Sequence, residues 1–326
     1  MPTSLRSGRS SRLVPHAGLL QICVAGVLWG TGGLAVQVIR DHADLSATTI
    51  SAYRTTIAAI VLVVACVLTR QLAAVRRLLA ARPGPTVFVG LATAAYQALY
   101  FASVVWVGVT VSTVVSLGVA PLALTIRDAV QRRRGPDLVE ALTVFAALAG
   151  LVLVTGTAGL GETGPHPVLG VLAALASGSA YAIATAVGEP LARSTAPLVL
   201  TTAATSVGAC GLVPVALLTG GPLTTSDPVA LLTLLYLGAL TFALAYALLY
   251  AGLRTTSSSA AVVATLCEPV TAAVAAAAFL GERLTALGVL GIVLVVAAIA
   301  GTARERHPVG AGPVADPDPG RPRVAG

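Results

Sequence analysis

Long apolar runs alternate with short polar breaks along almost the whole chain. A helix needs about 20 apolar residues to cross the hydrocarbon core of a bilayer, and ten runs come close to or exceed that length. Most breaks between them carry the turn and charge signals of loops, as in RDHADLS, QRRRGPD and GGPLTTSDP. The pattern therefore predicts an all-α integral membrane protein with ten transmembrane helices. The expected spans are 17–39, 47–69, 86–107, 109–130, 138–156, 167–187, 197–219, 229–252, 257–280 and 284–301.

Composition supports the lipid bilayer as the surrounding partner of this chain. Of its 326 residues, 56% are hydrophobic and 10% are charged, whereas a soluble protein carries about 25% charged residues. The net charge of +7 does not indicate nucleic-acid binding, because the arginines lie in short loops and tails and form no basic face. The cysteines show no CxxC or Cys/His spacing, so we expect no metal and no cofactor. They are Cys23, Cys66, Cys210 and Cys267.

The basic residues predict how the spans are oriented. If the N-terminus is cytoplasmic, all arginines except Arg40, Arg54 and Arg283 fall on the cytoplasmic side, and the chain has no lysine. The positive-inside rule favours this arrangement. We therefore expect a multi-pass protein of the plasma membrane with both termini in the cytoplasm. The tails, 1–16 and 302–326, are rich in Ser, Pro, Gly and Arg, which predicts disorder.

The two halves of the chain match one another weakly, at an offset of about 150 residues. Five spans make one copy, and because five is odd, the second copy enters the membrane from the opposite side. This predicts two inverted-topology five-helix repeats, 17–156 and 167–301, an arrangement common in secondary transporters. The matched positions are Trp29 with Tyr181, Tyr96 with Tyr246, Tyr100 with Tyr250, and Pro121 with Pro269.

This organisation resembles the drug/metabolite transporter superfamily, and within it the EamA branch, also called the ten-span RhaT-like group. The resemblance rests on the WG of the first span, on Arg54 in AYRTTIAA and on EPV…FLGERLT…LGVLGIVLVV, and it is most specific over 257–300. It implies transport of small metabolites or drugs, usually export. The first half departs from the pattern, because QRRRGPD replaces a GER-like turn and Ala120 stands where a glutamate would precede the proline. Glu268 is thereby left without a symmetry mate.

Glu268 and Arg54 are the only charged residues well inside predicted spans, and such residues are functional candidates. Glu268 shares its helix face with small and polar residues, so we expect it to face protein or water rather than lipid. Three roles stay open for it: carrying a proton coupled to transport, binding a cationic substrate group, or forming a structural pair. The Arg54 guanidinium suits either Glu268 or a substrate carboxylate.

Two prolines and a set of aromatic residues complete the candidate site. Pro121 and Pro269 predict helix breaks in matching spans, which either line a cavity or are kinks packed by neighbouring helices. In particular, Pro269 is expected to leave the carbonyl of Thr265 without a donor. Tyr250, Trp106 and Tyr53 lie near span ends, where an interfacial aromatic belt is the alternative. Deeper residues that could line a ligand site are Trp29, Tyr96, Gln97, Tyr100, Tyr181 and Tyr246.

The leading functional hypothesis is a secondary active transporter, more specifically an exporter, that moves a small organic solute by alternating access. Protons are the candidate coupling ion, and the chain carries no GxxxxGK[ST] motif for an ATPase of its own. An intramembrane enzyme is one alternative, although the histidines all lie in loops or tails. A channel or scaffold is another, but no filter-like segment or ring of polar residues is present. Substrate and oligomeric state are left open.

Overall fold

The computed structural model describes residues 17–156, 165–219, 221–279 and 284–304. These residues contain helices and no strand, and ten helical segments are long and apolar enough to cross a membrane. The predicted fold class and the order of the spans are therefore confirmed. The predicted tails, 1–16 and all but the first three residues of 302–326, lie outside the described residues.

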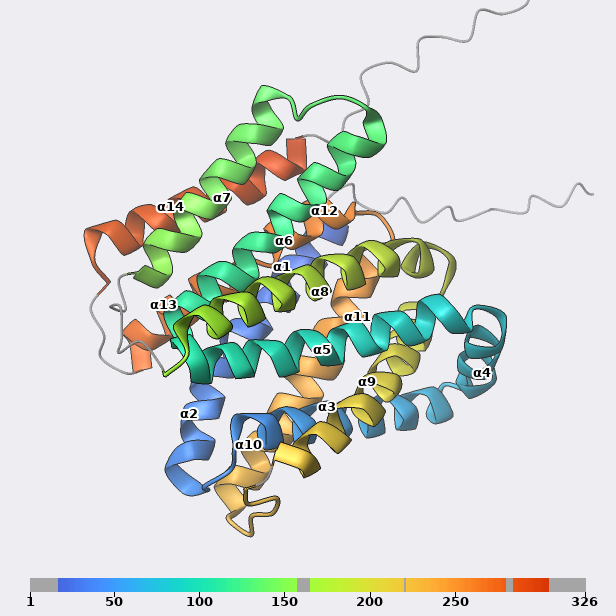
Figure 1. The fold of residues 1–326 in the computed structure, drawn as a ribbon. Helices are drawn as coiled ribbons and strands as arrows, with labels where there is room; N and C mark the ends of the chain where they lie inside the picture. The colour runs from blue at the N-terminus through green and yellow to red at the C-terminus, as the bar shows by residue number, and fades with distance from the viewer. Residues whose placement is uncertain (1–16, 157–164, 220, 280–283, 305–326) are drawn as a thin grey trace, which may run out of the picture.

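Figure 1 shows the helices packed side by side in one bundle. Six spans are single helices: α3 (Ala47–Leu68), α5 (Pro83–Val107), α6 (Val109–Arg132), α7 (Leu138–Gly156), α8 (Pro167–Ser194) and α9 (Pro197–Thr219). The tenth span is also a single helix, α14 (Ala286–Arg304). The remaining three are interrupted. The first is α1 (Ala17–Gly30) with α2 (Gly32–His42), and the ninth is α12 (Ser258–Ala264) with α13 (Cys267–Phe279). The eighth is α10 (Pro228–Gly238), the π-helix η1 (Ala239–Leu244) and α11 (Ala245–Gly252).

Several helices begin at residues that satisfy their free backbone amides. The Asp227 carboxylate accepts a hydrogen bond from the Ala230 amide at 2.8 Å, and the Ser46 hydroxyl accepts one from the Thr49 amide at 3.1 Å. Such side-chain caps stabilise helix N-termini. Prolines occupy the first turns of α5, α8 and α10, where a missing N–H costs nothing. Local sequence therefore fixes where these spans start.

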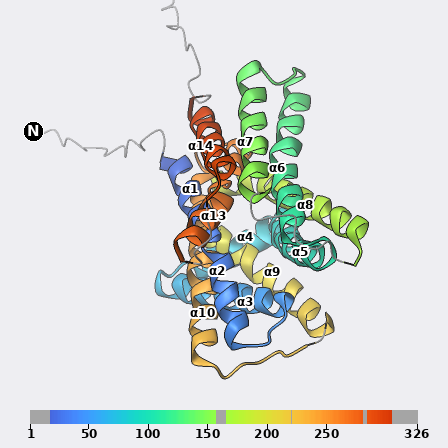
Figure 2. The same ribbon diagram turned by 90° about the vertical axis from the view of Figure 1, so that its left-hand side faces the viewer.

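Contacts between spans show the two-fold relation between the halves. The second span packs against the seventh (α3 with α9) and the fifth against the tenth (α7 with α14, side by side in Figures 1 and 2). The third packs against the sixth (α5 with α8), as the eighth packs against the first (α11 with α1). Likewise the fourth packs against the sixth, as the ninth packs against the first. Exchanging the two sets of five spans reproduces the same contacts, as an inverted repeat requires.

The short helix α4 (Leu72–Ala81) between the second and third spans was not expected from the sequence. It is too short to cross the membrane, and its apolar positions recur three residues apart. Val75 and Leu78 are buried, while Arg76 and Arg77 are exposed, and the helix packs against α9 and α5. A helix with one apolar and one basic face is suited to the membrane surface. Figure 1 shows it at the edge of the bundle.

The ninth span is interrupted just before Pro269, and its backbone differs from the one expected. The Leu266 amide donates to the Val263 carbonyl at 3.1 Å, and the Glu268 amide donates to the Thr265 carbonyl at 2.9 Å. These bonds join residues three apart and form a tight turn between α12 and α13. The prediction that the Thr265 carbonyl has no donor is therefore wrong, because the backbone leaves α-helical geometry before the proline.

Pro121 does not interrupt its span. Helix α6 continues across it from Val109 to Arg132. The expected pair of breaks in matching spans is thus present in the second half only. Pro121 and the neighbouring Ala120 are buried, and Ala120 packs in an apolar cluster with Tyr181 and Val262. Tight packing on both sides of a proline is compatible with an uninterrupted helix.

Two glycines let α1 lie against the interrupted ninth span. A Cβ atom on Gly30 would come 2.5 Å from the carbonyl oxygen of Glu268, and one on Gly26 would come 3.0 Å from the Cβ of Cys267. No side chain fits at the first distance without moving backbone. Close approach of helices at small residues is the usual basis of packing within a membrane. The pair of glycines therefore positions Glu268 relative to the first span.

Substitution of Gly30 by alanine is expected to destabilise the protein by about 1–3 kcal/mol, the usual cost of overpacking a core. Gly33→Ala is the matched control, since a Cβ at Gly33 meets nothing within 4 Å. In that variant, stability should stay the same or rise slightly because alanine is the better helix former. Thermal unfolding of the purified protein in detergent measures both. Equal stability of the two variants would contradict the close packing of α1 on α13.

Candidate functional site

A cavity of about 430 Å³ lies between spans of both repeats. We call it the central cavity. It brings together all the side chains that the sequence proposes as substrate or coupling residues, while Pro121 lies outside it. The side chains that line it include Trp29, Arg54, Tyr96, Gln97, Tyr100, Tyr181, Tyr246, Glu268 and Pro269. That these residues bind a solute stays a prediction.

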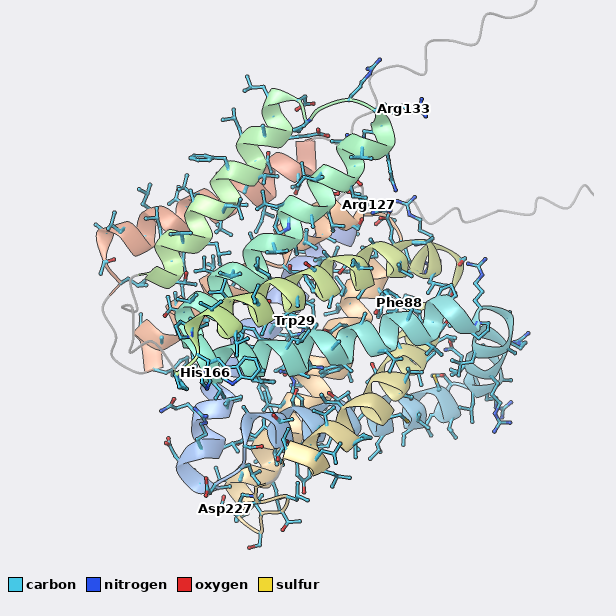
Figure 3. The ribbon with its side chains drawn as sticks, in the orientation of Figure 1. Trp29, Phe88, Arg127, Arg133, His166 and Asp227 are labelled. Atoms are coloured by element: carbon cyan, nitrogen blue, oxygen red, sulfur yellow. The ribbon has the colours of Figure 1, made fainter. Side chains whose placement is uncertain are left out.

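The described lining of the central cavity extends toward one face of the bundle. It extends to Gln37 and Arg40 at the end of α2 and to Ala47 and Val109 at the starts of α3 and α6. These positions lie at the membrane face opposite the ends of the described chain. In Figure 3, Trp29 lies near the middle of the bundle, with Arg127 and Arg133 toward one end and His166 and Asp227 toward the other. We call the face that holds the chain ends the terminal face.

Aromatic side chains from both repeats form the walls of the central cavity. The ring centroids of Tyr96 and Tyr181 lie 5.2 Å apart, as do those of Trp29 and Tyr246. The Tyr100 hydroxyl is 2.8 Å from the Thr113 hydroxyl, which holds that ring in place. Rings in such contact are rigid and apolar and carry a polar tip. They are suited to stacking against a small organic solute.

Tyr250 belongs to this aromatic core and not to an interfacial belt. Its side chain is 3% exposed, and its ring centroid lies 6.3 Å from that of Tyr246. The belt, which the sequence left open as an alternative for Tyr250, does not apply, because α11 packs against α1, α8 and α9. Tyr53 differs, since its hydroxyl donates to the Leu223 carbonyl at 2.8 Å in the segment that leads into α10.

Glu268 lies in the first turn of α13, directly after the break in the ninth span. Among the described residues, none forms an ion pair with its carboxylate within 4.0 Å and none donates a hydrogen bond to that group. The carboxylate therefore faces the central cavity, as the sequence predicts. Its place at a helix N-terminus favours negative charge there.

Arg54 projects into the same cavity from α3. Its guanidinium carbon lies 5.3 Å from the centroid of the Phe242 ring, a cation–π contact with η1. Its Nε is buried and has no hydrogen-bond partner. A direct pair with Glu268, one of the two options that the sequence leaves open for Arg54, is absent, since no ion pair within 4.0 Å joins them. The reason is packing: α3 lies against α9, α10 and η1, whereas α13 lies against α1, α2, α7 and α14.

The described side chains offer the cavity stacking surfaces, hydrogen-bond donors and three charged groups, which are those of Arg40, Arg54 and Glu268. In the part of the chain that the structure describes, no three His, Cys, Asp or Glu side chains lie close enough to hold a metal ion. The cysteines are all free thiols. What the arrangement can do chemically is bind a solute through its shape, its rings and its charge.

Polar side chains join spans of both repeats at the terminal face, and we call this group the terminal-face network. Its residues come from the fourth, sixth and ninth spans. The Arg127 guanidinium donates to the Ser258 hydroxyl at 3.1 Å, and the Ser259 hydroxyl contacts the Asp128 carboxylate. The other carboxylate, Glu189, accepts from the Ser258 amide at 3.0 Å and from Arg193 at 2.7 Å. The network therefore joins α6 of the first repeat to α8 and α12 of the second.

The contacts of this network were not predicted from the sequence. They lie at the ends of apolar runs, where charged residues are normally loop and orientation signals. The only local signals are the spacing of Glu189 and Arg193, which places both on one helix face, and the run Ser257 to Ser259. These segments lie far apart in the sequence, so only the tertiary structure shows that they meet.

The fold and the central cavity define a class of protein, namely a multi-pass membrane protein whose two five-helix halves enclose a solute-sized cavity. A model of the EamA-like transporter family matches residues 16–156 and again residues 168–304. The chain therefore belongs to the EamA-like transporter family, and it is a membrane transporter. The resemblance seen in the sequence is confirmed.

One relative agrees with this assignment, and one solved structure shares the fold. YwfM, an uncharacterized transporter of Bacillus subtilis strain 168, is 32% identical over 283 residues, which make up 85% of this chain and 90% of the relative. A protein of known crystal structure shares the fold with a TM-score of 0.73 at 20% identity, over 88% of this chain and 98% of that one. Neither likeness identifies a solute.

Loss of the Glu189 carboxylate should loosen the terminal face, because Glu189→Gln weakens contacts to both Ser258 and Arg193. An ion pair and a charged hydrogen bond at a partly exposed site contribute ~1 kcal/mol, so opening should rise roughly fivefold. Opening is measured in a variant whose only cysteine replaces Thr265, by labelling that cysteine with an impermeant maleimide added from the terminal side. Glu140→Gln is the control, since Glu140 pairs with Arg132 within one repeat at 2.5 Å. Equal labelling of the two variants would contradict the network's role in closure.

Proposed function

We propose that this protein is a secondary active transporter that exports a small organic metabolite or drug by alternating access. One observation carries the proposal: the central cavity is bounded by spans of both repeats and extends toward one membrane face, while the terminal-face network joins both repeats at the other. A carrier needs a site that can be reached from one side at a time. The volume of the cavity, about 430 Å³, suits a small organic solute.

The inverted repeat supplies a second conformation by symmetry. The fourth, sixth and ninth spans meet at the terminal face. Their counterparts in the other half are the ninth, first and fourth spans, which border the cavity mouth through α13, α2 and α6. If the two halves exchanged conformations, the mouth would close and the terminal face would open. This exchange is how inverted-repeat carriers alternate access around a fixed site.

In the orientation proposed from the arginines, the terminal face lies on the cytoplasmic side of the plasma membrane. The exposed arginines of α4 and the residues Arg133 and Arg134 lie on that face. The central cavity is then open to the outside, which is the conformation from which an exporter has released its solute.

Proton coupling at Glu268 fits this conformation. The carboxylate faces the cavity without an ionic partner among the described residues, so it can take up a proton from the outside. Neutralisation would lower the cost of enclosing the group when the mouth closes. Release of the proton to the cytoplasm would complete the cycle and leave the site ready for the solute.

Glu268→Gln tests both transport and coupling. A comparison of metabolites exported by cells with wild-type or variant protein identifies a solute, which is then loaded into proteoliposomes. We expect the variant to keep solute exchange at equilibrium but to lose accumulation driven by a pH gradient, by at least tenfold, because glutamine cannot carry the proton. Glu140→Gln, which removes a surface carboxylate outside the cavity, should behave as wild type. Undiminished gradient-driven accumulation by Glu268→Gln would exclude Glu268 as the coupling group.

A further inference from the structure

Two buried hydrogen-bond donors at the central cavity have no acceptor. They are Nε of Arg54 and Nε2 of Gln97, and both side chains line the cavity. Gln97 is only 5% exposed. A buried donor without an acceptor is costly, and more so when it is charged. Two other buried polar atoms without a partner, in Thr86 and Thr256, belong to side chains that do not line the cavity.

Local contacts determine which groups of Gln97 and Arg54 are left without a partner. The Ser51 hydroxyl donates to Oε1 of Gln97 at 2.8 Å, so the carbonyl end of the amide is occupied and its NH₂ group is left free. Ser51 and Arg54 are three residues apart on α3 and therefore share a helix face. The ring of Phe242 holds the guanidinium from the other side. Arg54 on α3 and Gln97 on α5 thus each keep a hydrogen-bond donor that has no acceptor.

We propose that Arg54 and Gln97 form a seat for an anionic group of the transported solute, and that this group is a carboxylate. The inference rests on the proposed transport function and adds a substrate class to it. A guanidinium and an amide NH₂ both lack acceptor atoms, and the two oxygens of a carboxylate can accept from both. The aromatic walls receive the rest of the solute, so the class is a small carboxylic acid with an apolar or aromatic body.

Glu268 does not occupy this seat. It projects from α13, on the wall formed with α1, whereas the seat is built on α3 and α5 beside η1. Among the described residues no carboxylate pairs with Arg54 within 4.0 Å. The seat is thus a positive and hydrogen-bonding region separated from the one acidic side chain of the cavity wall.

A buried water is the competing explanation for Gln97. A small cavity of about 10 Å³ lies beside the central cavity and is lined by Gln97 together with Thr55, Thr93 and Thr205. A volume of that order is at the lower limit for one water molecule. Arg54 does not line this small cavity, so a water there would leave the Arg54 donor unexplained. Thr205 lines only the small cavity and offers a way to separate the two explanations.

The test measures binding of three matched probes: phenylacetate, phenylacetamide and phenethylamine. Trp29 lines the central cavity, and the only other tryptophan is Trp106. In a Trp106→Phe background, quenching of the remaining tryptophan fluorescence in detergent reports binding to the cavity. We expect phenylacetate to bind at least tenfold more tightly than either neutral or cationic probe. Gln97→Leu should weaken phenylacetate binding about tenfold, and Arg54→Gln should remove the preference for the acid.

Thr205→Val is the control for the small cavity and should leave phenylacetate binding unchanged. The proposed seat would be overturned if the wild type showed no preference for phenylacetate, or responded to none of the probes. It would also be overturned if Gln97→Leu kept the full preference, or if Thr205→Val weakened phenylacetate binding as much as Gln97→Leu does. Because Arg54→Gln could fail to fold, Gln97→Leu by itself decides the question. If phenylacetate binds as expected but is not transported into proteoliposomes, the seat stands and the proposed function fails. If neutral or cationic solutes are transported without preference for acids, the function stands and the seat fails.

Discussion

Within hydrocarbon every backbone amide and carbonyl must find its partner inside the protein, and this constraint determines where the three interrupted spans lie. The eighth and ninth spans both pack against the first, so their irregular backbone faces protein or the central cavity. The Thr31 hydroxyl, at the break between α1 and α2, lies 2.7 Å from the Tyr236 hydroxyl of α10. The break in the ninth span is covered by α1 at Gly26 and Gly30. The breaks in the first and ninth spans line the central cavity through Gly30, Gly32, Thr265 and Glu268.

The two halves share a fold, but they are not equivalent at the cavity. Glu268 follows a break and faces open space, whereas Ala120, its counterpart before Pro121, is 1% exposed inside a continuous helix. A glutamate at Ala120 would be enclosed by Tyr181 and apolar neighbours with no room for water. One acidic side chain, Glu268, thus lines the cavity from the ninth span, and the basic side chains Arg40 and Arg54 line it from the first and second spans. The charged lining of the cavity therefore does not follow the two-fold relation between the halves.

Much of the architecture could be predicted because the bilayer allows few solutions. Apolar run lengths gave the ten spans, and the repeated Tyr and Pro positions indicated the five-span unit. The depth of Trp29, Tyr96 and Tyr181 was enough to select the cavity wall. The absence of an Arg54–Glu268 pair, the tight turn at Thr265 and the network around Glu189 depend on which helices touch. No local pattern contains that information, and the helix α4 was missed because its run is too short to register as a span.

Helix α4 limits how far its neighbouring spans can move along the membrane normal. Its exposed Arg76 and Arg77 lie at the terminal face, while its buried Val75 and Leu78 hold it to the bundle beside α9 and α5. If α3 or α5 slid along the membrane normal, these guanidinium groups would be pulled from the headgroup region into hydrocarbon, at a cost of several kcal/mol. The second, third and seventh spans are thereby tied to a fixed depth. In the proposed alternation of access, movement would then have to come from rocking of the remaining spans.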